Sequence, residues 1–427
     1  MEGALESASI HMTASPVSTA PDGTAASERL DVLDVLRGIA LLGMFLVHFN
    51  DHAAADQSAA ASAYQRIVVL FFEERFWTMF GILFGAGFAI QFQRADAKGS
   101  AFLPTYVRRM AMLAVFGFIA HGVFGFNVLL GYAAWGLALP IVRKWSIRML
   151  VCALVLSAMS GELYFLARAS YSVAVRGEEA TRAELRRVAA DSRAFVNANN
   201  AAQDSTDFRV VLAARLQRMP WFYSQWYSFL PVNNFTLFLL GVLGLRLGLF
   251  DQPARHRRLI AGLMVFGVAS WVFATWGPQR APAEGAPLVR EMLLSQLTSG
   301  FGLIRGMWLA FTYIGVILLL VANDAAWLGR FAVFGWPGRT ALTSYMSQVV
   351  VLDLTFAKYA LGAVVTPMGG LAAGVLLFLA NVVFSRWWLR SHPYGPLEWL
   401  WRSATYARWQ PWHLASGASP PRAVVTE

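Results

Sequence analysis

Residues 33–50, LDVLRGIALLGMFLVHFN, form an apolar run near the start of the chain. A helix rises about 1.5 Å per residue, so a run of this length crosses most of a hydrocarbon core about 30 Å thick. Similar runs recur along the chain, which is 57% hydrophobic and only 14% charged, against about 25% charged in a soluble domain. The composition excludes an ordinary soluble protein and predicts an all-α, polytopic membrane bundle.

The apolar runs between charged or Pro/Gly-rich breaks predict about ten transmembrane helices. We place them at 33–50, 76–92, 109–124, 127–142, 148–167, 229–249, 258–276, 302–321, 340–361 and 369–389. Only a Gly-rich stretch, 122–127, separates the third run from the fourth. These two runs are therefore either separate spans or a re-entrant pair.

Charge in the connecting loops predicts the orientation of the bundle. Loops 93–109, 143–148 and 250–258 are rich in Lys and Arg, whereas loops 51–75 and 277–300 are neutral or acidic. Cytoplasmic loops carry the excess of basic residues, so both termini are expected in the cytoplasm. The net charge of +10 is thus explained by the lipid bilayer, and we expect no nucleic acid as a partner.

The expected organisation has five parts. Residues 1–28 form a disordered cytoplasmic tail, 29–167 hold helices one to five, and 168–228 form an extracytoplasmic loop with a polar helix over 178–197. Residues 229–392 hold helices six to ten, and 393–427 form an interfacial helix and tail on the cytoplasmic face. The long loop is either a solvated cap or a lid that grips a substrate.

The first helix carries ionisable residues on one face. Asp34, Arg37 and His48 follow one another, through Leu41 and Met44, at steps of three or four residues. Arg37 and His48 are then about 16 Å apart along the helix axis. Each charge within a span costs about 2.5–3.5 kcal/mol on insertion scales, which favours a functional role. The competing interpretation is an Asp34–Arg37 anchor pair and an interfacial histidine.

The residue types on this face suit acyl transfer from a phosphorylated donor. An imidazole accepts a proton from a hydroxyl or amine and returns it to a leaving group, while guanidinium groups bind phosphate. Arg109 and Arg339 lie on the predicted cytoplasmic side with Arg37, where they either bind phosphates or anchor the helices. Together the three arginines are candidates for binding acyl-CoA.

Further candidates come from the predicted depth of each residue. Glu74, Arg75 and His121 lie in the outer half of the bundle with His48. Zinc binding by histidines is the weaker alternative, because the only cysteine lies in an apolar run and no metalloprotease signature is present. We therefore expect no metal.

Hydroxyl groups gather in the ninth helix. Thr340, Ser344 and Ser347 share one helical face, and Gln348 follows directly. They either line a polar cavity that receives substrate or form hydrogen bonds between helices.

Four motifs resemble the YeiB-like bacterial membrane proteins, also called domain of unknown function 418. They are RLDVLDVLRGIALLG at 29–43, RFWTMFGILFGAGF at 75–88, GRTALTSY at 338–345 and YGPLEWLWR at 394–402. The resemblance covers residues 29–412 and implies a multi-pass protein of the bacterial inner membrane. The first helix is also similar to that of the transmembrane acyltransferase superfamily, which includes the acyltransferase-three proteins and the heparan-glucosaminide N-acetyltransferases. This similarity implies that His48 occupies the catalytic position and Arg37 the donor side.

Three classes of function follow. The leading hypothesis is a membrane acyltransferase that moves an acyl group, such as acetyl, from cytoplasmic acyl-CoA to a small-molecule, glycan or lipid acceptor of the cell envelope. His48 would be the general base, and His121 and Arg75 would orient the acceptor or stabilise the oxyanion. The alternatives are a transporter of a small anionic metabolite, with the same residues as its binding site, and a non-catalytic membrane scaffold.

Overall fold

The computed structural model describes residues 23–54, 58–97, 102–126, 128–224, 234–276, 287–294 and 305–414, and every regular element in these ranges is a helix. The predicted all-α fold class is confirmed. In chain order the helices are α1 (Gly23–Asp51), α2 (Ala59–Ile67), the π-helix η1 (Val68–Phe72), α3 (Arg75–Ala97), α4 (Phe102–Gly122), α5 (Val128–Gly136), α6 (Leu139–Val142), α7 (Ile147–Arg176), α8 (Glu178–Gln203), α9 (Phe208–Ser224), α11 (Thr236–Arg246), the 3-10 helix η3 (Pro253–His256), α12 (Arg257–Trp276), α14 (Arg305–Asn323), α15 (Ala326–Arg330), α16 (Ala332–Arg339), α17 (Ala341–Phe356), α18 (Pro367–Trp388) and α19 (Pro396–Tyr406).

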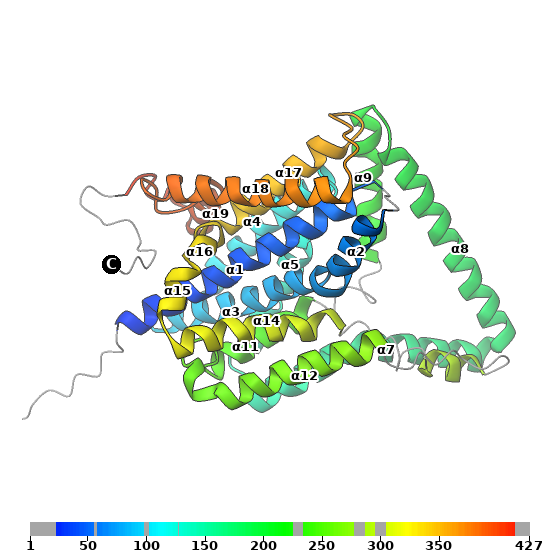
Figure 1. Cartoon of the computed structure of the whole chain (residues 1–427). Helices are drawn as coiled ribbons and strands as arrows, with labels where there is room; N and C mark the ends of the chain where they lie inside the picture. The colour runs from blue at the N-terminus through cyan, green and yellow to red at the C-terminus, as the bar shows by residue number, and fades with distance from the viewer. Residues whose placement is uncertain are drawn as a thin grey trace, which may run out of the picture.

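Several of these helices have the length and composition of membrane spans. Within the described ranges, three qualify: Val32–Asp51, Phe102–Gly122 and Pro367–Trp388. A bent pair, Ile147–Gly161 with Leu163–Arg176, gives up to four. Figure 1 shows the long helices side by side in a bundle, with α16 and α19 at one end and α8 across the other. The protein is thus a helical membrane protein.

Two of the predicted runs are interrupted. The run 127–142 divides into α5 and α6, and Pro140 in α6 lacks the N–H that a continuous helix would require. The run 340–361 begins after a break at Thr340, which separates α16 from α17, and its helix ends at Phe356. An apolar pattern records burial but not such breaks. The run 229–249 is described only from residue 234.

The ends of the chain differ in part from the expectation. Helix α1 begins at Gly23, inside the segment 1–28 for which the sequence predicts disorder. Residues 1–22 and 415–427, where the remainder of both predicted tails falls, lie outside the described residues.

The predicted loop 51–75 contains α2 and η1. A π-helix departs from the regular backbone hydrogen-bond pattern, so its carbonyls need other donors. The Leu70 carbonyl accepts a bond of 3.0 Å from the Trp271 indole of α12, and the Phe71 carbonyl accepts one of 2.7 Å from the Tyr313 hydroxyl of α14. This segment therefore packs onto the bundle and is not a plain solvated loop.

Helix α1 lies at the centre of the apolar core, and it crosses α16 at two glycines. Leu33, Leu36 and Phe45 are fully buried. A Cβ atom on Gly38 would overlap the Phe334 carbonyl, and one on Gly338 would overlap the Asp34 carbonyl. Small residues allow this close approach of helix backbones in lipid. The crossing holds the α1 and α16 backbones in direct contact.

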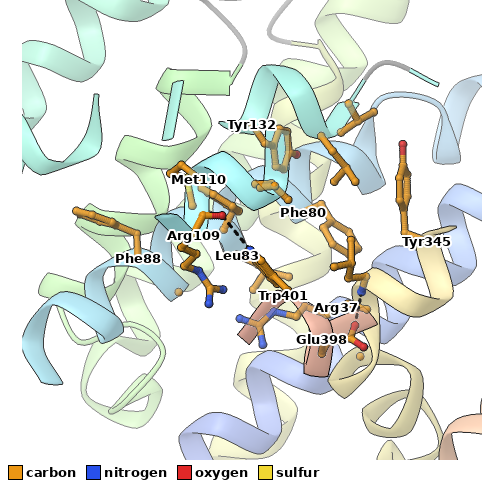
Figure 2. A pocket seen from close by; sticks show the side chains of 18 of the residues that line it. Arg37, Phe80, Leu83, Phe88, Arg109, Met110, Tyr132, Tyr345, Glu398 and Trp401 are labelled. Carbon is orange, nitrogen blue, oxygen red and sulfur yellow. Dashed lines mark hydrogen bonds between the residues drawn. The ribbon is translucent and has the colours of Figure 1, made fainter. Parts of the chain in front are cut away.

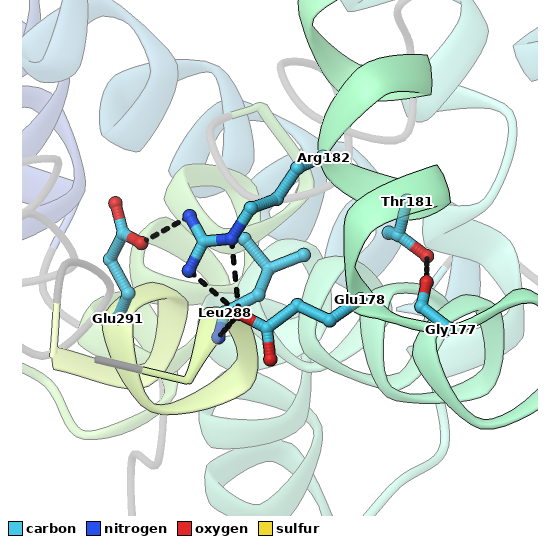
Figure 3. A network of polar contacts seen from close by, with 6 residues as sticks. All are labelled: Gly177, Glu178, Thr181, Arg182, Leu288 and Glu291. Atoms are coloured by element: carbon cyan, nitrogen blue, oxygen red, sulfur yellow. Dashed lines mark hydrogen bonds and ion pairs between the residues drawn. The ribbon is translucent and has the colours of Figure 1, made fainter. Parts of the chain in front are cut away.

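The α8 end of the bundle is tied together by polar contacts. The polar helix expected over 178–197 is α8, which extends to Gln203. Arg182 binds Glu178 at 2.9 Å and Glu291 at 2.8 Å, and Glu178 also accepts the Leu288 N–H at 3.0 Å (Figure 3). Helix α8 is thereby joined to the short helix at 288–294.

Helix α9 is anchored to the bundle by an ion pair that the sequence pattern does not predict. Arg215 binds Asp353 of α17 at 2.6 Å, with side chains only 8% and 3% exposed. Arg215 also donates to the Val123 carbonyl, and the Tyr359 hydroxyl donates to Asp353. Removal of either charge would leave the other buried, which typically costs 3–5 kcal/mol. The pair thus fixes α9 over the ends of α4 and α17.

At the opposite end, α19 caps α17. The Glu398 carboxylate accepts the backbone N–H groups of Leu342 and Thr343 at 2.7 and 3.0 Å and the Thr343 hydroxyl at 2.6 Å. These are N–H groups that the first turn of a helix cannot satisfy itself. The Trp401 indole donates to the Arg109 carbonyl of α4 at 2.9 Å. Helix α19 therefore closes one end of the bundle.

The glycine crossing leads to a first prediction. Gly38→Ala places a methyl group against the Phe334 carbonyl, and such overpacking typically costs about 1–3 kcal/mol. We expect a lower midpoint of thermal unfolding for the purified protein in detergent. Gly262→Ala in α12 is the matched control, because nothing lies within 4 Å of its Cβ position. Equal stability of the two variants would contradict a tight crossing.

The cap on α17 leads to a second prediction. Glu398→Ala removes the acceptor of two backbone N–H groups, and loss of a helix cap costs about 0.5–2 kcal/mol. Glu398→Gln keeps one acceptor oxygen and should lose less. Thermal unfolding of the two variants measures this order, and a Gln variant less stable than the Ala variant would refute the capping role.

Candidate functional site

A cavity of about 280 Å³ lies between α1, α3, α4, α5, α16, α17 and α19. Ligand sites commonly measure about 300–1,000 Å³, so this cavity has room for a small ligand or for part of a larger one. Its wall is mostly apolar and aromatic, with side chains from Met44, Trp77, Phe80, Leu83, Phe84, Phe88, Met110, Leu113, Tyr132, Tyr345 and Trp401. Figure 2 shows Arg37, Glu398 and Trp401 together on one side, opposite Tyr132.

Four arginines from four different helices line the same cavity. They are Arg37 of α1, Arg109 of α4, Arg339 of α16 and Arg402 of α19. The sequence predicts that the first three bind an anion together, and the fold brings all three to the same cavity. Arg402 is not predicted from the sequence, because its i, i+4 spacing from Glu398 is that of an ordinary surface pair on a helix.

The guanidinium groups are held by aromatic rings and by one carboxylate. The Arg109 guanidinium lies 3.8 Å from the ring centre of Trp401, and that of Arg402 lies 4.3 Å from the ring centre of Tyr394. Arg37 binds Asp34 at 2.6 Å. Cation–π contacts fix an arginine without neutralising it. Arg109 and Arg402 thus keep their positive charge beside the cavity.

Glu398 also lines the cavity, but its oxygens are engaged with α17. Burial raises the pKa of the Glu398 carboxyl above its usual value, against the opposing effect of the hydrogen bonds from Thr343. Among the described residues, Asp34 and Glu398 are the carboxylates beside the four guanidinium groups. The balance of charge is positive, and the cavity is therefore suited to an anion that also has an apolar part.

His48 lies one helical turn beyond the cavity. Met44 belongs to the lining and His48 does not. The His48 ring packs 5.3 Å from the ring of Phe126, and its Nδ1 is buried without a hydrogen-bond partner among the described residues. Fully buried Gln348 donates to the Met44 carbonyl at 3.2 Å, and its Oε1 is likewise without a partner in the described part of the chain. Near the turn of α1 that separates the cavity from His48, the His48 Nδ1 and the Gln348 Oε1 are thus both buried without a described partner.

The other outer candidates occupy separate places, and none of them lines the cavity. His121 is 3% exposed, and its Nδ1 lies 3.2 Å from the Tyr223 hydroxyl of α9. Arg75 is 6% exposed and donates to the Glu73 carbonyl. Glu74 precedes α3 with φ of 65°. The predicted common depth does not amount to a shared cavity in this structure.

The hydroxyl groups of the ninth predicted helix join α17 to α18. The Thr340 and Ser385 hydroxyls are 2.6 Å apart, Thr340 lies 3.4 Å from Ser344, and the Ser347 hydroxyl donates to Asn381 at 2.9 Å. None of the three predicted hydroxyl residues lines the cavity. Of the two interpretations left open by the sequence, the geometry matches hydrogen bonding between helices.

Comparison with known proteins gives relatives without an assigned activity. Residues 245–408 match the family model described as "Protein of unknown function (DUF418)". The chain is 28% identical to the uncharacterized protein YxaH of Bacillus subtilis, over 91% of this chain and 97% of the relative. It is 26% identical to an uncharacterized 39.9 kDa protein of Bacillus acidopullulyticus, over 91% and 96%.

A third relative matches over a shorter segment. The uncharacterized protein YeiB of Escherichia coli is 40% identical over 68 residues, which are 16% of this chain and 18% of the relative. No solved structure matches the chain. The match of residues 245–408 to this family model and the similarity to these relatives over most of the chain relate the protein to the DUF418 family.

Proposed function

We propose that this protein is a membrane acyltransferase that binds acyl-CoA in the cavity and moves its acyl group to an acceptor of the cell envelope. The observation that carries the proposal is the position of four arginines around an otherwise apolar and aromatic cavity. Phosphate groups bind to guanidinium groups, and an acyl-pantetheine arm fits an apolar channel. Acetyl-CoA is the simplest donor of this kind.

In this proposal, Arg37, Arg109, Arg339 and Arg402 bind the phosphates of the donor. The lining reaches from Arg37 to Met44 on α1, which is about 10 Å along a helix. The cavity is smaller than a complete CoA molecule requires, so the nucleotide would lie outside it, towards α19. The acyl end would point along α1 towards His48.

His48 acts as the general base towards the acceptor, with Gln348 beside it as a hydrogen-bonding residue. Both side chains have a buried polar atom without a partner among the described residues, which is the condition of a group that meets a ligand. The turn at Met44 separates them from the cavity, so the thioester reaches His48 only if the Met44 side chain moves aside. Methionine is well suited to such a movement because its side chain is unbranched and flexible.

We further propose ten spans with both termini in the cytoplasm, in a bacterial inner membrane. Helices occupy the positions of the predicted apolar runs, and the basic loops alternate with neutral or acidic ones along the chain. In this orientation the arginine cavity opens to the cytoplasm, where acyl-CoA is made.

A transporter of a small anionic metabolite is the second candidate. The observation that favours it is that the cavity has a charged wall but does not include a histidine. A transporter needs anion binding without a general base, and arginines buried in a bundle commonly mark such a pathway. The two functions differ in whether bound anion is chemically changed.

The arginine cavity leads to a third prediction. Arg109→Ala should weaken acetyl-CoA binding about 10- to 100-fold, since a hydrogen bond to a charged group is worth about 1.5–3 kcal/mol. Arg108→Ala is the matched control, because Arg108 is the adjacent residue, is exposed and does not line the cavity. Calorimetry on purified protein in nanodiscs measures both. Equal losses in the two variants would place the donor elsewhere.

The general base leads to a fourth prediction. His48→Ala should lower acceptor-dependent CoA release about 10²- to 10⁴-fold with little change in acetyl-CoA affinity. His52→Ala is the control, because His52 lies one turn further along the chain and is exposed. CoA release is followed with labelled acetyl-CoA and envelope sugars or lipids. Wild-type protein without turnover but with proton-coupled anion uptake in proteoliposomes would instead identify a transporter.

A further inference from the structure

Four tyrosines line the cavity: Tyr106, Tyr132, Tyr345 and Tyr394. The hydroxyl groups of the first three differ in whether they have a hydrogen-bond partner. The Tyr106 hydroxyl donates to the Gly136 carbonyl at 2.9 Å, and the Tyr132 hydroxyl donates to the Trp77 carbonyl at 3.2 Å. The Tyr345 hydroxyl is buried and has no hydrogen-bond partner among the described residues. Tyr345 as a whole is only 3% exposed.

An unpaired buried hydroxyl is costly. Leaving such a group unsatisfied costs about 1–3 kcal/mol, and phenylalanine would fill the same space without that cost. Tyrosine at this position is therefore not explained by packing against the described residues of the bundle. A hydrogen-bond acceptor supplied by a ligand explains it.

The position of Tyr345 indicates which part of a ligand it meets. Tyr345 lines the cavity from α17, and Gln348 on the next turn of that helix bonds to the Met44 carbonyl beside His48. Figure 2 shows Tyr345 and Tyr132 on the side of the cavity away from Trp401 and Glu398. Tyr345 is thus a lining residue that lies one turn before Gln348 on α17. The reacting end of a donor would pass this point.

We propose that the Tyr345 hydroxyl donates a hydrogen bond to the carbonyl oxygen of the acyl thioester in this cavity. The proposal rests on the proposed acyltransferase function and adds a catalytic residue to it. No role in the reaction follows for Tyr106 or Tyr132, because backbone carbonyls already occupy their hydroxyl groups.

The chemistry of this step balances without a further reactant. The acceptor hydroxyl or amine attacks the thioester carbon, a new C–O or C–N bond forms, and His48 takes the acceptor proton. The carbonyl oxygen becomes an oxyanion, to which the Tyr345 hydroxyl donates. The C–S bond then breaks, the carbonyl re-forms, and the CoA thiolate receives the proton from His48. Loss of one such donor typically lowers the rate about 10²- to 10³-fold.

Isotope-edited infrared spectroscopy tests the contact directly and needs no acceptor. The full-length protein in nanodiscs is loaded with acetyl-CoA that carries ¹³C at the thioester carbonyl, and the carbonyl band is recorded for wild type, Tyr345→Phe and Tyr132→Phe. A hydrogen bond to the carbonyl moves its band to lower wavenumber. We expect this shift in wild type and Tyr132→Phe and its loss in Tyr345→Phe.

Stability provides the matching control for a structural role. Tyr345→Phe removes a hydroxyl that has no partner among the described residues, so the thermal midpoint of this variant should equal or exceed that of wild type. Tyr106→Phe leaves the Gly136 carbonyl unpaired, so its midpoint should fall.

The outcomes separate this proposal from the one on which it rests. A wild-type protein that does not bind acetyl-CoA overturns both. Acetyl-CoA binding with the same carbonyl band in wild type and Tyr345→Phe overturns only the role of Tyr345. Loss of the shift in Tyr345→Phe, with unchanged acetyl-CoA affinity within about threefold and undiminished stability, supports it.

Discussion

The close contact of α1 with α16 is the constraint on which the rest of the structure depends. Lipid offers no hydrophobic drive for one helix to bind another, so packing must come from backbones that approach closely. Gly38 and Gly338 provide that approach, with each glycine against a carbonyl of the opposite helix. Arg37 directly precedes Gly38 in the sequence, and Arg339 directly follows Gly338. The crossing that holds the bundle together therefore also places two arginines at one cavity.

Arginines in an apolar bundle need a compensating environment, and this structure supplies several kinds. Asp34 neutralises Arg37, while rings of Trp401 and Tyr394 lie against Arg109 and Arg402. Aromatic faces attract a cation but leave its charge available to a further anion. The combination of one ion pair with two cation–π contacts is what separates this cavity from an ordinary set of anchoring arginines.

The sequence predicted the helical membrane class and most helix positions, because a long apolar run records burial directly. It also predicted that Arg37, Arg109 and Arg339 act together, from their shared depth alone.

The sequence did not predict the roles of Arg402 and Tyr345. Spacing on α19 relates Arg402 only to its own helix, and the state of the Tyr345 hydroxyl depends on neighbours from distant parts of the chain. Predicted depth was an insufficient guide for His121 and Arg75, because neither residue lines the cavity. The break at Thr340 escaped prediction because apolar residues continue on both sides of it.

Helix α19 supplies Glu398, Trp401 and Arg402 to the cavity, although it lies close to the end of the sequence. During synthesis, the earlier helices are released and inserted while this segment is still absent. The cavity wall is thus completed only as translation finishes. A product that stopped before Pro396 would keep its spans and the first helix of the cavity, but it would lack the part of the cavity wall that α19 provides. Premature termination would therefore affect the cavity rather than the spans that precede it.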